Sequence, residues 1–137
     1  MHWMLMPLRR YADFEGRSRR KEYWMFWLLN VLVALFVGLV FVVGYIANMS
    51  QTEMDTYLMP IVYLACLYSL ATFIPGLAVT VRRLHDTDRS GWNILWGLVP
   101  LIGGFILLYF YVSEGDPGPN RFGPDPKGAD TDSGIFA

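Results

Sequence analysis

Three long stretches without a single charged side chain set the strongest limit on how this chain can fold. They cover residues 23–47, 57–81 and 91–112, and none of them contains Asp, Glu, Lys, Arg or His. Each is longer than the roughly 18 apolar residues that indicate a membrane-spanning helix. Only 17% of the 137 residues are charged, against about 25% in soluble domains. The sequence therefore excludes a soluble globular protein, a disordered chain and a disulfide scaffold.

The pattern predicts an all-α integral membrane protein, a bundle of three transmembrane helices. A helix rises about 1.5 Å per residue, so each stretch can cross a hydrocarbon core of roughly 30 Å with some tilt. We expect one membrane domain over residues 1–126, with a short interfacial N-terminal segment and an extended polar C-terminal tail. Residues 127–137 are expected to be flexible. Pro75 and Pro100 lie inside the second and third stretches, where a bundle tolerates proline, so kinks rather than helix ends are expected.

Each apolar stretch carries one line of small or polar residues at helical spacing. Lipid gives helices no hydrophobic reason to associate, so helices in a membrane pack where small residues let their backbones approach closely. The three lines therefore predict one packed interior. The residues expected at these helix contacts are Asn30, Gly38, Gly76, Gly97 and Gly104.

The distribution of Lys and Arg predicts the orientation. Six precede the first stretch, none lies in residues 48–56, three lie in residues 82–90 and two follow residue 112. Because cytoplasmic loops carry the excess of Lys and Arg, we expect a multi-pass protein of the bacterial inner membrane with a cytoplasmic N-terminus. The loop at 82–90 is then cytoplasmic as well. With three spans, the tail, with two bases and five acids, is expected outside.

Two charged segments, residues 16–24 and 82–92, adjoin the membrane on the same expected side. Their side chains could anchor the topology, or they could bind anionic lipid headgroups at about 1 kcal/mol per basic residue. A third interpretation is an internal salt-bridge network, in which Glu22 pairs with Arg82 or Arg83 and Asp86 pairs with Arg17 or Arg20. The candidate residues for these roles are Arg17, Arg19, Arg20, Glu22, Arg82, Arg83, His85, Asp86 and Arg89.

A metal or acid–base centre would require His85, Asp86 and Asp88 to converge. Neighbouring residues of a helix point apart, and the chain has only one other histidine, His2, and one cysteine to complete a ligand set. We therefore predict no metal, no cofactor and no catalytic residue. Nucleic-acid binding is not expected either, because the net charge is −1 and the basic residues adjoin membrane spans.

Three motifs in these polar segments resemble a known family. They are Gly-Arg-x-x-Arg-x-Glu-Tyr-Trp at residues 16–24, Arg-Arg-Leu-His-Asp-Thr at 82–87 followed by Ser-Gly-Trp at 90–92, and Gly-Pro-Asn-Arg-Phe-Gly-Pro at 118–124. They are similar to the signatures of the domain of unknown function 805 family, over about residues 10–126. Asp88 departs from that pattern, in which Gly or another short residue is commoner. The resemblance implies a small multi-span bacterial inner-membrane protein and brings no reaction, ligand or catalytic residue.

The expected function is accordingly a binding or structural role at the cytoplasmic membrane face, through lipid headgroups or a partner protein, and not an enzymatic one. The alternative is a subunit of a small homo-oligomeric channel or transporter, lined by polar residues of the apolar stretches. No ionisable group lies inside those stretches, although coupled transport pathways normally need one. The lining residues in that case would be Asn30, Ser69, Thr72 and Asn93.

Overall fold

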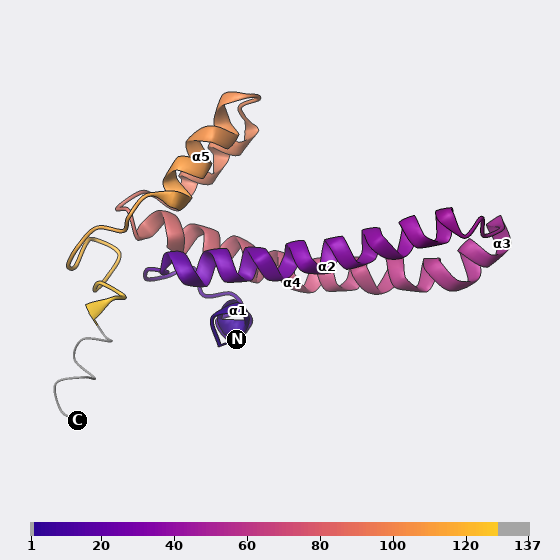
Figure 1. Ribbon diagram of the computed structural model, residues 1–137. Helices are drawn as coiled ribbons and strands as arrows, with labels where there is room; N and C mark the ends of the chain where they lie inside the picture. The colour runs from indigo at the N-terminus through magenta and orange to yellow at the C-terminus, as the bar shows by residue number, and fades with distance from the viewer. Residues whose placement is uncertain (1, 129–137) are drawn as a thin grey trace.

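The computed structural model describes residues 2–128, which are mainly helical (Figure 1). Within this range the β-type pairing is one isolated bridge between Asn120 and Gly123. The all-helical prediction is confirmed, whereas residues 129–137 of the expected flexible tail lie outside the described residues. In chain order the helices are α1 (His2–Arg9), α2 (Arg20–Ile46), α3 (Gln51–Glu53), the π-helical turn η1 (Met54–Leu58), α4 (Met59–His85), the 3₁₀ helix η2 (Gly91–Leu98) and α5 (Ile102–Val112).

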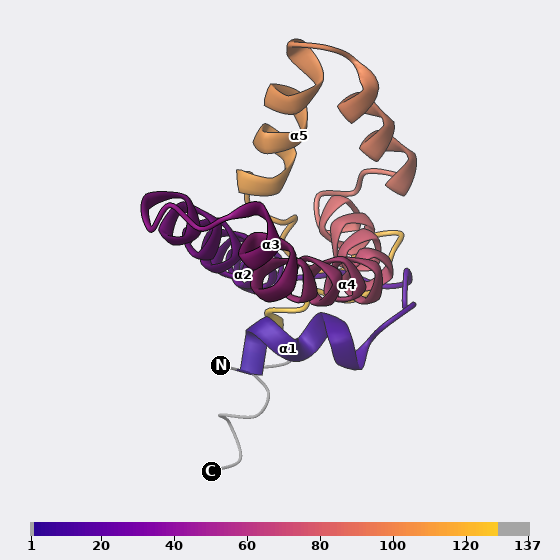
Figure 2. The same cartoon turned by 90° about the vertical axis from the view of Figure 1, so that its right-hand side faces the viewer.

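Helices α2 and α4 form a long antiparallel pair that dominates the molecule (Figures 1 and 2). Helix α2 coincides with the first apolar stretch, and α3, η1 and α4 follow one another without a break and contain the second. Both helical segments are long and apolar enough to cross a membrane, with mean hydropathy of 2.8 and 1.8 in their most apolar windows. Helix α4 continues through Pro75, as expected for a proline supported by a neighbouring helix.

The turn between α2 and α3 is built from local signals. Asn48 takes a positive φ of 50°, and Ser50 with Glu53 forms a reciprocal capping box at the start of α3, which satisfies two backbone donors at this helix end. Gly44 lets the pair close here, because a Cβ at this position would lie 3.0 Å from the Leu58 side chain. The turn therefore sets α4 directly against α2.

The third apolar stretch does not form one long helix, as a straight third span would. It folds into a hairpin of two short antiparallel limbs, η2 and α5, that projects from the end of the α2–α4 pair where α2 begins (Figure 1). At about 2.0 Å per residue for the eight residues of η2 and 1.5 Å for the eleven of α5, each limb is roughly 16 Å long. That is about half of a hydrocarbon core.

The reversal of this hairpin has identifiable causes. Pro100 has no N–H to continue the helical hydrogen bonds, and Leu101 adopts a φ of 67°, which turns the chain back. Gly103 then lies directly against the first limb, since a Cβ there would fall 1.7 Å from the Trp96 carbonyl oxygen. The prediction of a kink at Pro100 is wrong, because these three residues together end one helix and begin another.

Helix α1 runs across the α2–α4 pair. It is seen along its axis in Figure 1 and from its side in Figure 2, whereas the long helices show the opposite aspect. It packs on both long helices, and Pro7 is fully buried. This placement has the geometry of a segment lying in the membrane plane.

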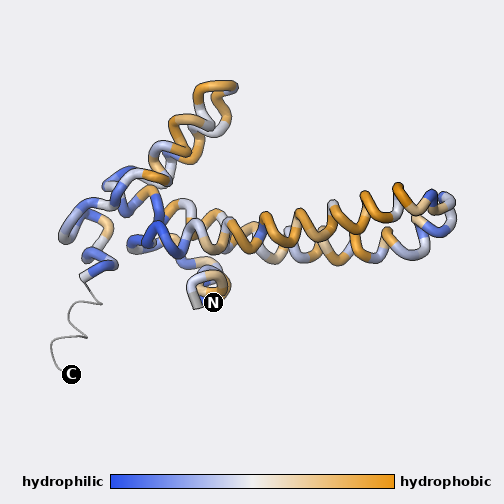
Figure 3. The backbone as a smooth tube through the Cα atoms, in the orientation of Figure 1, coloured by the Kyte–Doolittle hydropathy of each residue, from blue (hydrophilic) through white to orange (hydrophobic). Residues whose placement is uncertain are grey.

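The polar segments gather at one end of the α2–α4 pair, which we call the charged end and define as residues 9–22, 82–90 and 113–127. Figure 3 shows this concentration of hydrophilic residues, with the apolar colour along the long helices and the hairpin. The first limb of the hairpin starts at this end and the second limb returns to it. Residues 113–127 therefore lie beside residues 2–19, which we call the leader. The tail and the leader therefore share one end of the molecule, whereas the expected third span would have placed them at opposite ends.

The predicted line of small residues is only partly a packing line within the chain. A Cβ at Gly76 would touch Phe26 of α2 at 3.7 Å, and one at Gly97 would lie 3.2 Å from Leu107 of α5. At Gly38 and Gly104 a Cβ would meet no described atom within 4 Å, so these two glycines make no close approach to another helix within the described part of the chain. The Asn30 amide donates to the Phe26 carbonyl of its own helix at 2.8 Å.

Candidate functional site

The last turn of α4 buries an unusual amount of charge. Arg82 and Arg83 are completely buried, and His85 and Asp86 are at least nine-tenths buried. A buried charge is tolerated only when it is paired and hydrogen-bonded. The contacts of these side chains therefore define what the charged end does.

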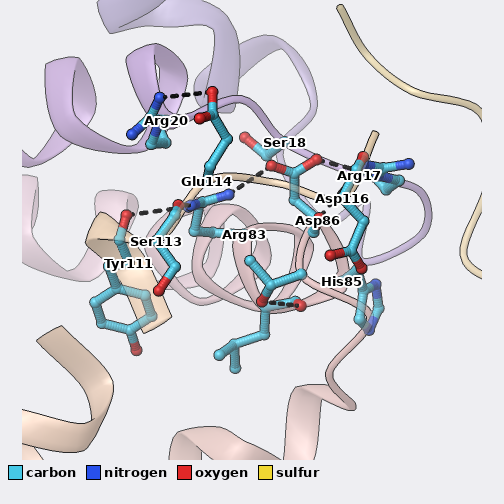
Figure 4. Close-up of polar contacts among 12 residues, drawn as sticks. Arg17, Ser18, Arg20, Arg83, His85, Asp86, Tyr111, Ser113, Glu114 and Asp116 are labelled. Atoms are coloured by element: carbon cyan, nitrogen blue, oxygen red, sulfur yellow. Dashed lines mark hydrogen bonds and ion pairs between the residues drawn. The ribbon is translucent and has the colours of Figure 1, made fainter. Parts of the chain in front are cut away.

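Asp86 is the centre of this network (Figure 4). Arg17 donates from Nε to Asp86 Oδ1 at 3.0 Å, and Arg83 donates from Nη1 to Asp86 Oδ2. All three side chains are at most 4% exposed. One carboxylate thus bridges two guanidinium groups, one from the leader and one from α4. The expected pairing of Asp86 with Arg17 is present.

The same two arginines hold the tail. Arg17 donates from Nη1 to the Gly118 carbonyl and from Nη2 to the Asp116 carbonyl, both at 2.6 Å. Arg83 donates from Nε to the Tyr111 carbonyl at 3.2 Å and from Nη2 to that of Ser113 (Figure 4). Backbone carbonyls therefore satisfy the donors that Asp86 leaves free, and the tail is tied to the leader and α4.

A second buried pair joins α2 to α4. Arg82 Nη2 lies 3.0 Å from Glu22 Oε1, and Ser18 Oγ donates to Glu22 Oε2 at 2.7 Å. The Ser18 N–H donates to the Arg82 carbonyl at 3.1 Å. Glu22 and Arg82 are at most 4% exposed. The expected pairing of Glu22 with Arg82 is present, and it fixes the start of α2 against the end of α4.

His85 packs the tail against the end of α4. Its Nδ1–H donates to the Gly16 carbonyl at 3.2 Å, and its ring stacks on Phe122 with centroids 3.8 Å apart and planes within 3°. Asn120 donates from Nδ2 to the His85 carbonyl at 2.9 Å. These contacts give His85 a packing role between the leader and the tail.

The remaining candidate arginines lie around this core. Arg19 donates from Nε to the Pro126 carbonyl at 2.7 Å, and its guanidinium lies over the Trp3 ring, 5.5 Å from the centroid. Arg20 pairs with Glu114 at 3.1 Å and not with Asp86. The Arg89 guanidinium lies over the Phe110 ring of α5 at 4.2 Å, which ties the hairpin to the loop before it.

Residues 11–124 match the family model described as "Protein of unknown function (DUF805)". The chain belongs to this family. Relatives include the inner membrane proteins YhaI and YhaH of Escherichia coli (strain K12), which are 48% and 43% identical. Each alignment covers 93% of this chain, and 97% of YhaI or 98% of YhaH. The uncharacterized protein YiiR of the same organism is 24% identical over 84% of this chain. No solved structure matches, and the predicted family resemblance is confirmed.

The buried ionic network lies wholly inside the part of the chain that matches the DUF805 family, but sequence reasoning missed half of it. The tail supplies backbone carbonyls, which carry no residue-type signal. Gly115 is equally necessary, because a Cβ there would lie 2.0 Å from Asp86 Oδ2. The runs of Gly and Pro in residues 115–124 were the available signal, since they indicate a backbone that turns tightly and approaches other groups closely.

The DUF805 chain also has a groove of about 370 Å³ between α2 and α4, lined in part by Asn30, Ser69 and Thr72. These three polar side chains hydrogen-bond carbonyls of their own helices, at 2.8–2.9 Å. Asn93 lies apart from them, in η2, where it bonds the Ser90 carbonyl. The four residues of the expected channel lining therefore do not converge within one chain.

Proposed function

We propose that this protein resides in the bacterial inner membrane and binds anionic lipid headgroups with its charged end, on the cytoplasmic face. The proposal rests on the distribution of basic residues, because all eleven Lys and Arg residues belong to the charged end. Juxtamembrane clusters of this kind attract anionic lipid at about 1 kcal/mol per basic side chain. The names of YhaI and YhaH, both inner membrane proteins, support the membrane assigned.

The balance of charge supports the orientation. The eleven basic residues of the charged end accompany eight Asp and Glu among the described residues, an excess of three positive charges. The turn at the other end of α2 and α4 carries Glu53 and Asp55 and no Lys or Arg. By the positive-inside rule, the charged end, and with it the N-terminus and the tail, is cytoplasmic.

Two spans and a re-entrant hairpin fit this orientation best. Helices α2 and α4 cross the bilayer, and the η2–α5 hairpin enters the cytoplasmic leaflet and returns to the same face. Its outer surface is apolar, since Leu98, Leu101 and Phe105 are at least three-quarters exposed and contact acyl chains. The buried network then lies at the base of the hairpin, at the depth of the headgroups.

Some basic side chains are exposed to the headgroup region, although they form ion pairs at the surface. Arg17, Arg82 and Arg83 are buried in ion pairs and cannot reach lipid. The side chains of Arg20 and Lys127, in contrast, are 43% and 54% exposed. We therefore assign the salt-bridge interpretation to the buried arginines and the headgroup interpretation to the exposed bases. In this proposal the two interpretations apply to different residues of the charged end.

The orientation predicts a labelling pattern. With Cys66 replaced by Ala, single cysteines introduced by Glu15→Cys, Ser50→Cys and Gly128→Cys are treated with a membrane-impermeant maleimide on intact spheroplasts. Only the Ser50→Cys protein should react, because only that turn is periplasmic, and lysis should expose the other two. Labelling of the Gly128→Cys protein on intact spheroplasts would mean that the third stretch crosses the membrane.

The headgroup proposal predicts selective lipid retention. The full chain, purified in a neutral detergent, should bind phosphatidylglycerol in native mass spectrometry more tightly than phosphatidylcholine. Raising the salt concentration should weaken this preference, because exposed charge pairs are screened. Equal retention of the two lipids at low salt would contradict the proposal, whereas a stable homo-oligomer without bound lipid would favour the channel alternative.

A further inference from the structure

The charged end contains a partly open cavity lined mainly by basic residues, which we call the basic pocket. It has a volume of about 250 Å³ and is lined by residues from three segments that are distant in sequence. Arg19, Arg20 and Lys21 begin α2, Asp86 ends α4, and Gly115 and Lys127 come from the tail. The cavity exists only because the tail folds back over the start of α2.

The charge of this pocket is strongly positive. Four of its six lining residues are Lys or Arg, and the single carboxylate, Asp86, is already neutralised by Arg17 and Arg83. The positive charge that lines the pocket therefore comes from the four basic side chains, two of which, Arg20 and Lys127, pair with Glu114. Such a cavity favours an anion.

The start of α2 adds to this preference. The N-cap residue of this 27-residue helix, Arg19, makes no side-chain capping hydrogen bond, because a guanidinium has only donors and cannot accept from the N–H groups of the first turn. The N–H groups of the first turn carry the positive end of the helix dipole. Arg20 and Lys21, which carry two of these N–H groups, also line the pocket.

An internal carboxylate spans the basic side chains of the pocket. Glu114 Oε1 lies 3.1 Å from Arg20 Nη2 and 2.8 Å from Lys127 Nζ. The hydrogen bond from Lys127, with the nearby charges of Lys127 and Arg20, lowers the pKa of Glu114, so this group is ionised at neutral pH. Its side chain is 67% exposed, and it can swing into solvent when a stronger anion arrives.

We propose that the basic pocket binds a phosphate group. Arg20 and Lys21 are the principal ligands of the phosphate, and the bound phosphate displaces the Glu114 carboxylate from Arg20 and Lys127. A phosphate offers more charge and more acceptor oxygens than one carboxylate. The pocket lies at the start of α2, the end of the proposed span that would adjoin the headgroups, and this position favours the phosphate of an anionic lipid headgroup over free phosphate. This inference rests on the proposed headgroup function and assigns it a site.

The test compares soluble phosphate probes on the full chain in a neutral detergent. Dihexanoyl phosphatidylglycerol, inorganic phosphate and dihexanoyl phosphatidylcholine are titrated, and the Kd is read from the shift in melting temperature and from native mass spectrometry. Arg20→Gln combined with Lys21→Gln should weaken phosphatidylglycerol binding about thirtyfold, as expected for the loss of two charges beside a phosphate. Arg121→Gln, which removes an exposed charge of the same end outside the pocket, should change the Kd less than threefold.

A second variant tests the displacement step. Glu114→Gln should tighten phosphatidylglycerol binding about fivefold, because the phosphate no longer competes with a carboxylate. Asp88→Asn removes an equal charge from the Arg121 pair of the same end and should leave the Kd unchanged. Equal tightening in both variants would overturn the pocket in favour of a diffuse surface field.

The outcomes separate the two proposals. Binding of inorganic phosphate that is lost with Arg20→Gln and Lys21→Gln, without lipid binding, would support the pocket and refute the headgroup function. Phosphatidylglycerol binding that survives these changes would keep the headgroup function and overturn the pocket. Failure of the wild-type protein to prefer phosphatidylglycerol or phosphate over phosphatidylcholine would overturn both.

Discussion

Asp86→Asn should destabilise the protein by about 3–5 kcal/mol, the cost of removing one partner from a buried ion pair. The change keeps the shape of the side chain but leaves Arg17 and Arg83 without a counter-charge, and their side chains are only 1% and 0% exposed. The contacts among the leader, α4 and the tail should all weaken, because these arginines also hold the tail. The measurement is the free energy of unfolding in mixed detergent micelles, followed by circular dichroism.

Asp88→Asn is the matched control. Asp88 lies two residues away and pairs with Arg121, but the two side chains are 48% and 60% exposed, so the pair is worth about 0–1 kcal/mol. Its positive φ of 51° suits Asn as well as Asp. Equal losses at Asp86 and Asp88 would contradict a buried network.

A charge exchange tests which leader arginine is the partner. Asp86→Arg should destabilise the protein severely, and Arg17→Asp in the same chain should recover part of the loss by restoring the attraction between leader and α4. Recovery should be incomplete because Arg83 then faces a new cation. Arg20→Asp should give no recovery, since Arg20 pairs with Glu114. Rescue by Arg20→Asp but not by Arg17→Asp would overturn the pairing.

Gly103→Ala should open the η2–α5 hairpin at a cost of about 1–3 kcal/mol or more, as for other overpacked sites. The new methyl group would fall 1.7 Å from the Trp96 carbonyl oxygen and 2.8 Å from its carbonyl carbon. Both are backbone atoms of the opposite limb, so no side-chain rotation relieves the clash. A lowered thermal unfolding midpoint in detergent is the expected result.

Gly104→Ala supplies the comparison within the same helix turn. A Cβ at Gly104 meets no described atom within 4 Å, and Ala is a better helix former than Gly by about 1 kcal/mol. Stability should therefore be unchanged or higher. A straight third span would make the two substitutions equivalent, so a matching result at Gly103 and Gly104 would refute the hairpin.

The sequence by itself determined the two long apolar helices, the family and the residue types of the buried pairs. Hydrophobic transfer free energy adds up residue by residue, so local counting located α2 and the apolar part of α4 correctly. The two charged segments adjoin the same end of the apolar helices, so each acidic side chain has few basic partners within reach. Glu22 with Arg82 and Asp86 with Arg17 were among the few pairs that the topology permits.

Only the tertiary structure decided the path of the third stretch, the end of the molecule at which the tail lies, and which glycines contact other residues. Residues 91–112 are as apolar as a span, and their reversal depends on Leu101 at positive φ and on backbone contact at Gly103. The tail was misplaced because a count of Lys and Arg ignores carbonyl groups, and those of Asp116 and Gly118 accept from Arg17. Hydropathy and charge counts add up the properties of neighbouring residues. These features depend on contacts between residues far apart in the chain, so such counts cannot predict them.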